Sequence, residues 1–231
     1  MMLMRLIDWN DLDSRMKNEY VRNVYLNLTK KKTTLFIKRL LDICFSLLLL
    51  ILLLPLIIII GIIIKIDSKG PIIFKQTRVT QFYKEFTIYK FRTMIDSRKL
   101  DGKLITVKDD DRITRVGKVL RKIRFDEFPQ LINILKGEMT FVGARPEVMD
   151  IVVQYSNQMF STLLLPAGLT SRASIMFKNE NDMLMDNDEN YYINVLLEEK
   201  MKHNIEYMQK VSIFEDINIL IMTFVKIFLR A

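Results

Sequence analysis

Two adjacent carboxylates, Asp126 and Glu127, stand among basic residues in the stretch Arg-Phe-Asp-Glu-Phe-Pro-Gln-Leu. Arg121 and Arg124 precede the pair, and Arg145 follows it further along the chain. Acidic residues near the start of a helix are stabilised by the helix dipole alone, which would explain the pair without any chemistry. A carboxylate surrounded by arginines stays ionised, however. The pair is therefore a candidate reactive site.

An ionised aspartate in this position can act as a nucleophile toward phosphorus. Arginines bind phosphate oxygens through two parallel hydrogen bonds. Mg²⁺ prefers one or two carboxylates together with substrate phosphates, which makes Asp126 its candidate ligand. The chain has a single histidine, His203, and a single cysteine, Cys44, which excludes a Cys-rich metal site and any site built from several histidines. The chemistry indicated is that of bound anions.

An apolar run of 22 residues, 43–64, contains Pro55 near its middle. A straight helix of this length reaches about 33 Å, enough to cross a bilayer. Pro55 favours a bend, and cations flank the run on both sides, whereas a single span carries them mainly on its cytoplasmic side. The sequence therefore leaves two alternatives open, a transmembrane span and a re-entrant hairpin that leaves the membrane on the face where it entered.

The formal net charge of +8 fits nucleic acid, anionic lipid or an anionic substrate as partner. The cations cluster beside the apolar run, and no nucleic-acid-binding motif is visible, so lipid and anionic substrate are favoured over nucleic acid. Before the run, apolar residues recur at roughly helical spacing in 1–34. This segment is expected to be a short amphipathic helix on the membrane or a poorly ordered leader.

After the apolar run the sequence predicts a helix-rich α/β domain. Strands are expected over 72–76 and 82–91, and 141–146 is expected to be a strand that enters a tight loop. Helices are expected over 114–123, 129–135, 147–159 and 191–209. Residues 96–111 and 166–170 are expected to be loops. The apolar stretch 214–229 is expected to belong to the core or to lie in the membrane interface. The resulting division is a leader, 1–34, a membrane helix, 35–66, and a catalytic domain, 67–231.

Several short motifs stand in a characteristic order along the chain. They are KRLLD at 38–42, Pro55 in the apolar run, GPIIFKQTR at 70–78, YKFRTM at 89–94, DRITRVG at 111–117, FDEFPQL at 125–131, KGEM at 136–139 and VGARPE at 142–147. Together they make the chain resemble the monotopic phosphoglycosyl transferases, a bacterial sugar transferase family of undecaprenyl-phosphate sugar phosphotransferases. The resemblance extends from about Lys38 to about Phe228.

The resemblance implies transfer of a phosphosugar from a UDP-sugar to undecaprenyl phosphate, with release of UMP, a covalent phosphosugar-aspartate and Mg²⁺. It implies that Asp126 is the nucleophile and metal ligand and that Glu127 is its partner. Substrate-binding roles fall on the residues Arg121, Arg145, Pro146 and Lys90. It further implies a re-entrant helix bent at Pro55, which places the catalytic domain on the cytoplasmic face of the bacterial inner membrane.

The sequence departs from the family pattern at several positions. Leu54 precedes Pro55 where serine is common, Ala144 replaces a proline, Ala167 replaces the proline of a Pro-Gly pair, and 171–174 lacks the usual Trp-Gly. The sugar therefore cannot be inherited from better-known members. No large domain precedes the apolar run, so a minimal form is expected. The rival interpretation is an inactive membrane-anchored scaffold or lipid-binding protein of glycan assembly, which would have no reason to retain the acidic pair and its arginines.

Overall fold

The computed structural model describes residue 4 and residues 6–95, 112–178 and 191–226. The helices are α1 (Glu19–Thr29), α2 (Lys32–Asp67), α3 (Arg115–Lys122), α4 (Gln130–Lys136), α5 (Met149–Val152), α6 (Arg172–Met176), α9 (Leu197–Lys210) and α10 (Ile213–Phe224). The strands are β1 (Ile73–Thr80), β2 (Lys84–Phe91), β3 (Met139–Val142) and β4 (Ala167–Thr170). Shorter 3-10 helices cover Trp9–Asp11, Ser14–Met16, Gln81–Tyr83, Phe125–Glu127 and Met159–Leu164, and a π-helix covers Tyr192–Leu196. The prediction of a helix-rich α/β domain is confirmed, and the expected loop at 96–111 lies outside the described residues.

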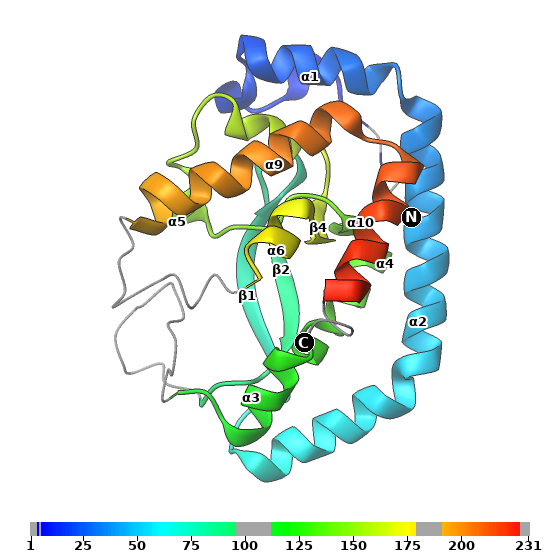
Figure 1. The fold of residues 1–231 in the computed structure, drawn as a ribbon, viewed down its shortest axis with the longest axis vertical. Coiled ribbons are helices and arrows are strands. Elements are labelled where there is room, and N and C mark those ends of the chain that lie inside the picture. Colours follow the sequence, from blue (N-terminus) through cyan, green and yellow to red (C-terminus); the bar gives the residue numbers. More distant parts are fainter. Residues whose placement is uncertain (1–3, 5, 96–111, 179–190, 227–231) are drawn as a thin grey trace.

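The long helix α2 contains the whole apolar run and continues through Pro55. It is long and apolar enough to cross a membrane, and only 17% of its most apolar 18-residue window is buried in the protein. Figure 1 shows the helix changing direction in its cyan part, before it passes beneath α3. The helix contains Pro55, and a proline inside a helix removes one backbone hydrogen bond and favours a bend.

Polar side chains fix the first half of α2 to the domain. Lys38 donates to the carbonyl of Val142 at 2.9 Å and pairs with Asp216 at 2.5 Å. Arg39 donates to the last carbonyls of α4, Ile134 at 2.6 Å and Leu135 at 2.9 Å. Asp42 accepts from the backbone N–H of Phe141 at 3.1 Å. The KRLLD motif is therefore an anchor that joins α2 to β3, α4 and α10.

The second half of α2 is held near its C-terminal end. Arg92, which follows β2, donates from Nη2 to the carbonyl of Ser68 at 2.6 Å. Ile60 and Ile64 are buried in one cluster with Phe91 and Leu120. The helix thus contacts the domain near both ends and also in its middle, where Leu49, Leu50 and Leu53 pack against a second apolar cluster. Its outer face carries exposed leucines and isoleucines.

The N-terminal segment forms α1, which is shorter than the expected stretch 1–34. Its apolar stripe, Val21, Val24 and Leu28, is buried in the main core cluster together with Leu12 and Met16. An amphipathic pattern predicts that the apolar face of a helix is buried, but it does not distinguish burial in the protein core from burial in the membrane. Here the cover is protein, and the alternative of an apolar face turned to the membrane is wrong for this stripe.

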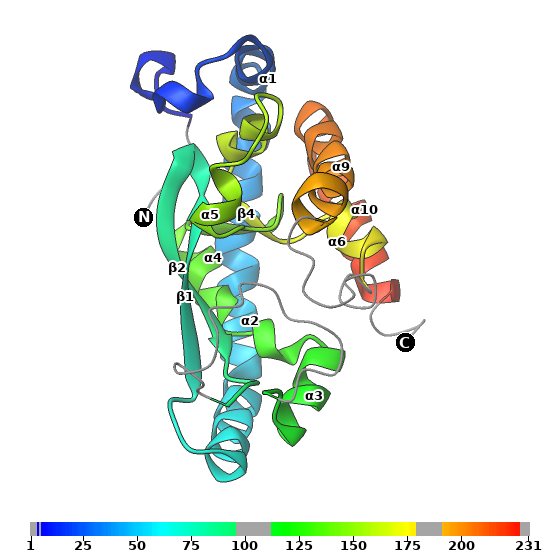
Figure 2. The same cartoon turned by 90° about the vertical axis from the view of Figure 1, so that its left-hand side faces the viewer.

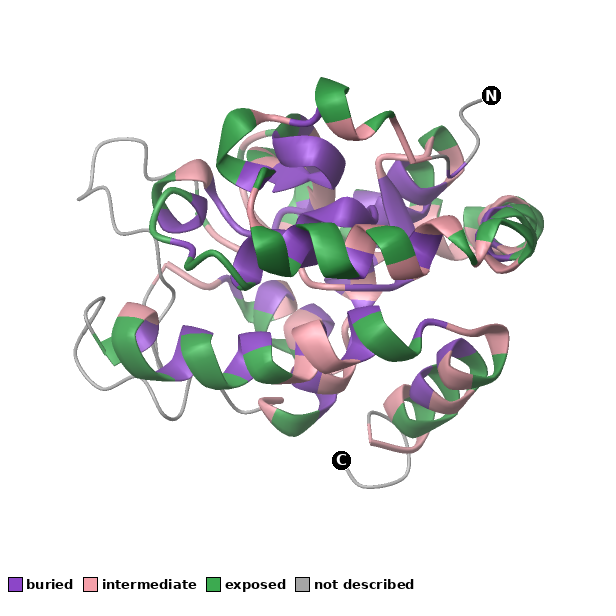
Figure 3. Ribbon diagram, turned by 90° about the horizontal axis from the view of Figure 1, so that it is seen from above, coloured by how far each residue is buried: buried purple, intermediate pink, exposed green. Residues whose placement is uncertain are grey.

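Two small sheets position the remaining elements. The strands β1 and β2 form an antiparallel hairpin in which Ile73 opposes Phe91 and Thr80 opposes Lys84. The strands β3 and β4 pair in parallel, with Val142 opposite Thr170. Figure 2 shows the hairpin on one side of the molecule and α9, α6 and α10 on the other. In Figure 3 buried residues fill the interior, and the outer helices carry alternating buried and exposed positions.

Two expectations after the hairpin are wrong. The expected loop at 166–170 forms β4, and the expected helix at 147–159 is helical over Met149–Val152 and then again, as a 3-10 helix, from Met159. The expected strand that enters a loop within 141–146 is confirmed, since β3 begins at Met139, ends at Val142 and is followed by a loop. The parallel pair of β3 with β4 joins segments distant in sequence, so local composition gives no sign of it. The expected helices at 114–123, 129–135 and 191–209 are confirmed within a few residues.

Candidate active site

The acidic pair sits in a tight turn between α3 and α4. Thr114 caps the start of α3 by accepting from the N–H of Gly117 at 2.9 Å. A side chain at Gly117 would bring its Cβ to 2.1 Å from the carbonyl oxygen of Thr93, so glycine allows α3 to lie against the segment after β2. Arg124 then adopts left-handed backbone angles (φ 60°, ψ 20°) directly before the 3-10 helix Phe125–Glu127. Such a conformation is costly for arginine and is typical of functional turns.

Glu127 is the charged centre of the site. Its Oε1 lies 2.5 Å from Nη2 of Arg145 and 3.3 Å from Nζ of Lys90. Burial raises the pKa of the Glu127 carboxyl, but Arg145 and Lys90 outweigh burial and hold that pKa well below its usual range. Glu127 is therefore ionised, and the structure brings together three predicted site residues from β2, the turn after α3 and the loop after β3.

Asp126 differs from its neighbour. The residue is 8% exposed, and its Oδ1 is buried with no hydrogen-bond partner among the described residues. Burial raises the pKa of the Asp126 carboxyl, and the adjacent Glu127 charge raises it further. A buried carboxylate oxygen without a donor is costly, so Oδ1 of Asp126 is an oxygen that a bound cation or donor would stabilise.

The donor set at this position fits a divalent cation that binds with the substrate. Among the described residues there is no group of three or more His, Cys, Asp or Glu residues that could hold a metal. Glu127 is already engaged by two cations, which leaves the orphaned oxygen of Asp126 as the available carboxylate ligand. One carboxylate with the remaining positions filled by phosphate and water suits Mg²⁺.

The loop that carries Arg145 is fixed by a close approach of two glycines. A Cβ on Gly168 would lie 2.1 Å from the carbonyl oxygen of Gly143. The N–H of Gly168 donates to the carbonyl of Ala144 at 2.7 Å, and the N–H of Gly143 donates to the carbonyl of Thr170 at 3.0 Å. The alanine in place of the family proline therefore stands in a loop held by backbone hydrogen bonds directly before Arg145.

A cavity of about 600 Å³ opens beside Glu127. Arg121, Arg145 and Pro146, to which the resemblance gives substrate-binding roles, line it, whereas Asp126 and Lys90 are not part of its wall. Arg124, which lies next to the pair, also lines it. Pro55 lies within α2 and is not part of the wall. The wall carries four arginines and three lysines against two glutamates, Glu127 and Glu147, and this excess of cations attracts a polyanion.

A second charged cluster on the cavity wall was not anticipated. Tyr192 donates to Oε1 of Glu147 at 2.8 Å, Lys200 donates to the Tyr192 hydroxyl at 3.0 Å, and Arg78 pairs with Glu147 at 3.5 Å. Arg78 also donates to the carbonyl of Pro146 at 3.2 Å. The cluster thus links β1 and the helices around α9 to the loop that carries Arg145 and Pro146.

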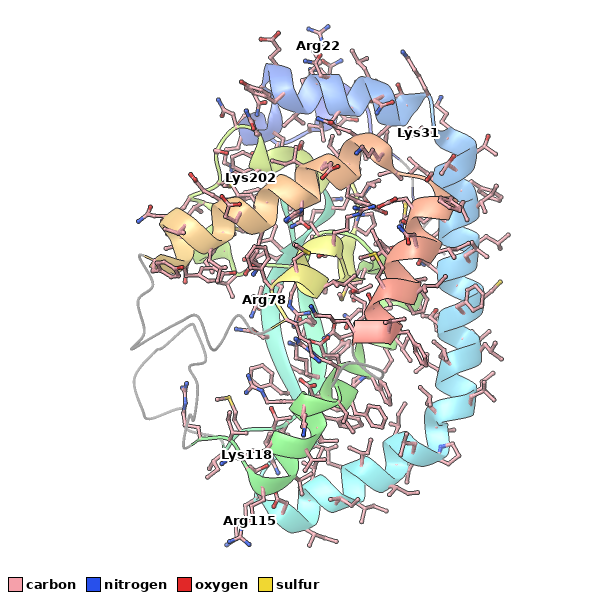
Figure 4. All side chains as sticks on the ribbon, in the orientation of Figure 1. Arg22, Lys31, Arg78, Arg115, Lys118 and Lys202 are labelled. Carbon is pink, nitrogen blue, oxygen red and sulfur yellow. The ribbon has the colours of Figure 1, made fainter. Side chains whose placement is uncertain are left out.

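Part of this cluster carried a signal in the sequence. Arg78 and Glu147 end two of the motifs quoted above, so their positions could have been singled out. Tyr192 and Lys200 come from a π-helix and the helix after it, and no motif marked them. Figure 4 labels Arg78 near the middle of the molecule, whereas Arg22 and Arg115 project outward at opposite ends.

The family is established by comparison with known proteins. The model for bacterial sugar transferases matches residues 33–230, which is most of the chain and includes α2, the acidic pair and the second charged cluster. The chain belongs to the bacterial sugar transferase family. This agrees with the resemblance drawn from the motifs.

Named relatives support the same class. The chain is 34% identical over 192 residues to the UDP-N-acetylgalactosamine-undecaprenyl-phosphate N-acetylgalactosaminephosphotransferase of Aeromonas hydrophila, covering 81% of this chain and 43% of that protein. It is 32% identical over 193 residues to the uncharacterized sugar transferase EpsL of Bacillus subtilis (strain 168), covering 84% and 88%. It is 34% identical over 197 residues to the UDP-glucose:undecaprenyl-phosphate glucose-1-phosphate transferase of Klebsiella pneumoniae, covering 84% and 40%. The chain spans about two fifths of the length of the Aeromonas and Klebsiella relatives.

Proposed function

We propose that this protein is a phosphoglycosyl transferase that moves a phosphosugar from a UDP-sugar to undecaprenyl phosphate and releases UMP, as the first membrane step of a bacterial glycan. The observation that carries the proposal is the asymmetry of the acidic pair. Glu127, on the wall of the arginine-lined cavity, is held ionised by Lys90 and Arg145, while the adjacent Asp126, outside that wall, keeps an unpartnered oxygen. The names of the relatives supply the donor and acceptor class.

The first step is attack on the donor. An oxygen of the Asp126 carboxylate forms a bond to the phosphorus next to the sugar, and the bond from that phosphorus to the bridging oxygen breaks, so UMP leaves with the electron pair. In this proposal Arg121 and Arg145, which line the cavity, bind the phosphate oxygens. Glu127 holds Arg145 and Lys90 in position for this task.

The second step regenerates the enzyme. A phosphate oxygen of the acceptor attacks the phosphorus on Asp126, the phosphorus–carboxylate bond breaks, and the product is the lipid diphosphate sugar. When bound, Mg²⁺ would neutralise charge on the phosphates at Asp126. No proton needs to be lost from a dianionic acceptor phosphate, so the neighbouring Glu127 can remain ionised throughout.

The membrane arrangement in this proposal is monotopic. The apolar α2 enters the cytoplasmic leaflet of the inner membrane, bends where Pro55 interrupts its hydrogen bonds, and leaves on the same side. Support comes from the exposed apolar length of α2 and from the contacts that hold both of its ends on one domain. Nucleotide sugars and Mg²⁺ would then reach the cavity from the cytoplasm.

The test separates the two steps. Detergent-solubilised protein is incubated with a panel of UDP-sugars, without acceptor, and UMP release and intact mass are measured. We expect one stoichiometric release of UMP and a phosphosugar adduct on the tryptic peptide 125–136. This peptide contains both acids, so Glu127→Gln is run in parallel and should keep the adduct on Asp126, formed more slowly.

The matched variants are Asp126→Asn and Asp150→Asn. Asp150 is an exposed aspartate in α5 that lies outside the cavity wall. Asp126→Asn should abolish the adduct and reduce turnover to background, while Asp150→Asn should behave like the unmodified protein. An active Asp126→Asn variant, or an adduct that maps to another residue, would overturn the covalent mechanism.

A further inference from the structure

The middle of α2 forms one wall of the cavity. Leu49 and Leu53 line it and pack against the apolar cluster around α4 and β4. Their neighbours Leu48 and Leu52 are 50% and 64% exposed on the outer side of the same helix. The apolar surface inside the cavity is therefore separated from the exposed apolar face of α2 by the width of a single helix.

The C-terminal half of α10 forms a facing wall. Leu220 and Phe224 line the cavity and are themselves partly exposed. The ion pair between Asp216 and Lys38 joins the start of α10 to α2. Further along, the hydroxyl of Thr223 lies 2.8 Å from that of Thr170 at the end of β4, so this half of α10 is tied to the domain instead.

Cations complete the cavity next to these apolar walls. Lys178, which follows α6, lines it and donates to the carbonyl of Lys226 at 3.0 Å, and Lys226 lines it as well. Arg121 and Arg124 lie on the wall near the acidic pair. A water-soluble nucleotide sugar is too polar to match the apolar surface that leucines from the two helices form. A ligand that joins a long apolar chain to an anionic phosphate matches both kinds of surface.

We propose that the lipid acceptor, an isoprenoid phosphate, enters the cavity between α2 and the C-terminal half of α10. This inference rests on the proposed function. The chain lies against Leu49, Leu53 and Leu220, and the phosphate reaches the cations beside Glu127. The acceptor thus approaches from the membrane side, and the donor from the side of the acidic turn. Nothing in the names of the relatives assigns this entrance.

Two adjacent substitutions on α10 test the entrance. Leu220→Trp enlarges a residue that lines the cavity, and Ile221→Trp makes the same kind of change at a neighbour that is 58% exposed and outside the cavity wall. We expect Leu220→Trp to raise the KM for undecaprenyl phosphate about ten-fold or more. The KM for a two-isoprene phosphate should rise less, because a short chain occupies less of the entrance. Ile221→Trp should match the unmodified protein, and equal KM values for the two variants would overturn the proposal.

A crosslinking measurement covers the case in which Leu220→Trp fails to fold. A photoreactive benzoylphenylalanine is placed at Leu49 or at Leu48, and labelled undecaprenyl phosphate is supplied in mixed micelles. Position 49 should give a crosslink that excess unlabelled acceptor competes away, whereas any crosslink at position 48 should resist competition. Competable crosslinking at position 48 and none at position 49 would overturn the entrance.

The same samples distinguish failure of the entrance from failure of the proposed function. UMP release without acceptor is measured for each protein. If the unmodified protein releases no UMP from any donor, the proposed function is wrong, and the proposed entrance for the acceptor is then wrong as well. If UMP is released but the KM for acceptor does not respond to Leu220→Trp, the entrance alone is wrong.

Discussion

Arg145 and Glu127 come from different elements and meet with Nη2 of the arginine 2.5 Å from Oε1 of the glutamate. The glutamate arises from the turn between α3 and α4, and the arginine from the loop that follows β3. Both residues line the cavity, and Glu127 is buried whereas the Arg145 side chain is 28% exposed. A buried pair is damaged more by losing one partner than an exposed pair is.

Arg145→Lys tests the planar guanidinium. Lysine keeps the charge but cannot present two parallel donors to a phosphate. We expect the rate of UMP release at saturating donor to fall about a hundred-fold, with the thermal unfolding midpoint little changed. Arg22→Lys, at an exposed position on α1 (Figure 4), is the matched control. Equal rates for the two variants would show that the fork of Arg145 does not contact the reacting phosphate.

The topology of α2 is tested by single cysteines in a Cys44→Ala background. Thr33→Cys and Lys69→Cys place thiols at exposed positions at the two ends of the helix. Lys69 is preferred to Ser68 because the Ser68 hydroxyl accepts from Arg92. A membrane-impermeant reagent should label both thiols from the cytoplasmic side only. Labelling of either one from the periplasmic side would establish a simple span.

Chelation tests the metal. EDTA should abolish turnover and Mg²⁺ should restore it, because the phosphate charge of the donor is left uncompensated without a cation. Since the described residues hold no cluster of three potential ligands, the protein without donor should bind Mn²⁺, used as a spectroscopic probe, much more weakly than the protein with donor. Full turnover after exhaustive chelation would rule out the metal.

Gly168→Ala tests the loop that carries Arg145. The new Cβ would lie 2.1 Å from the backbone oxygen of Gly143, a contact that neither strand can relieve cheaply. The free energy of unfolding should fall by about 1–3 kcal/mol or more. Gly61→Ala is the control, because its Cβ would meet a side-chain atom of Ile72 at 3.4 Å within a helix, and it should stabilise by up to about 1 kcal/mol. Similar unfolding midpoints would show that the glycine contact is looser than observed.

Tyr207 should make the protein sensitive to alkali. Burial raises the pKa of its phenol well above the ordinary value of 10.0, and the Asp216 charge raises it further. Because the folded pKa lies above the unfolded one, the stabilising contribution is complete below pH 10 and is lost as the pH rises beyond it. Tyr207→Phe should flatten this alkaline slope in denaturant unfolding, and Tyr20→Phe, at an exposed tyrosine, should not.

The same substitution has a cost at neutral pH. The Tyr207 hydroxyl donates to Asp216 at 2.6 Å, so the phenylalanine variant loses about 1 kcal/mol there. Tyr155 also has a pKa raised well above its ordinary value by burial, so part of the alkaline slope should remain. A slope identical to that of the unmodified protein would show that Tyr207 does not titrate in this range.

The parts of the fold that follow from local chemistry could be predicted from the sequence. The helix α4 begins directly after Pro129 and ends at Gly137, which adopts the left-handed conformation expected of a helix cap. The helix α3 starts after Thr114, whose side chain caps it. Each of these boundaries depends on one residue and its immediate neighbours, so the chain itself carries the information.

The parts that were missed depend on contacts between distant segments. The strand β4 exists because two glycines let it approach β3, and neither glycine by itself marks a strand. Glu147 gains its partners Tyr192 and Lys200 only when the helices around α9 fold against the loop. Of the predicted site, the meeting of Glu127 with Arg145 and Lys90 rested on the motifs, because no periodic pattern brings those three residues together.

The two attachments of α2 fix how its two ends are rotated relative to each other about the helix axis. Lys38, Arg39 and Asp42 at one end, and Ile60 with Ile64 toward the other, must face the domain at the same time. One residue inserted between them would rotate the far attachment by about 100° and advance it by about 1.5 Å. The helix therefore fixes the distance between its two attachments and also forms part of the cavity wall. Apolar residues can be exchanged freely along its outer face, but its length between the two attachments cannot change by a single residue.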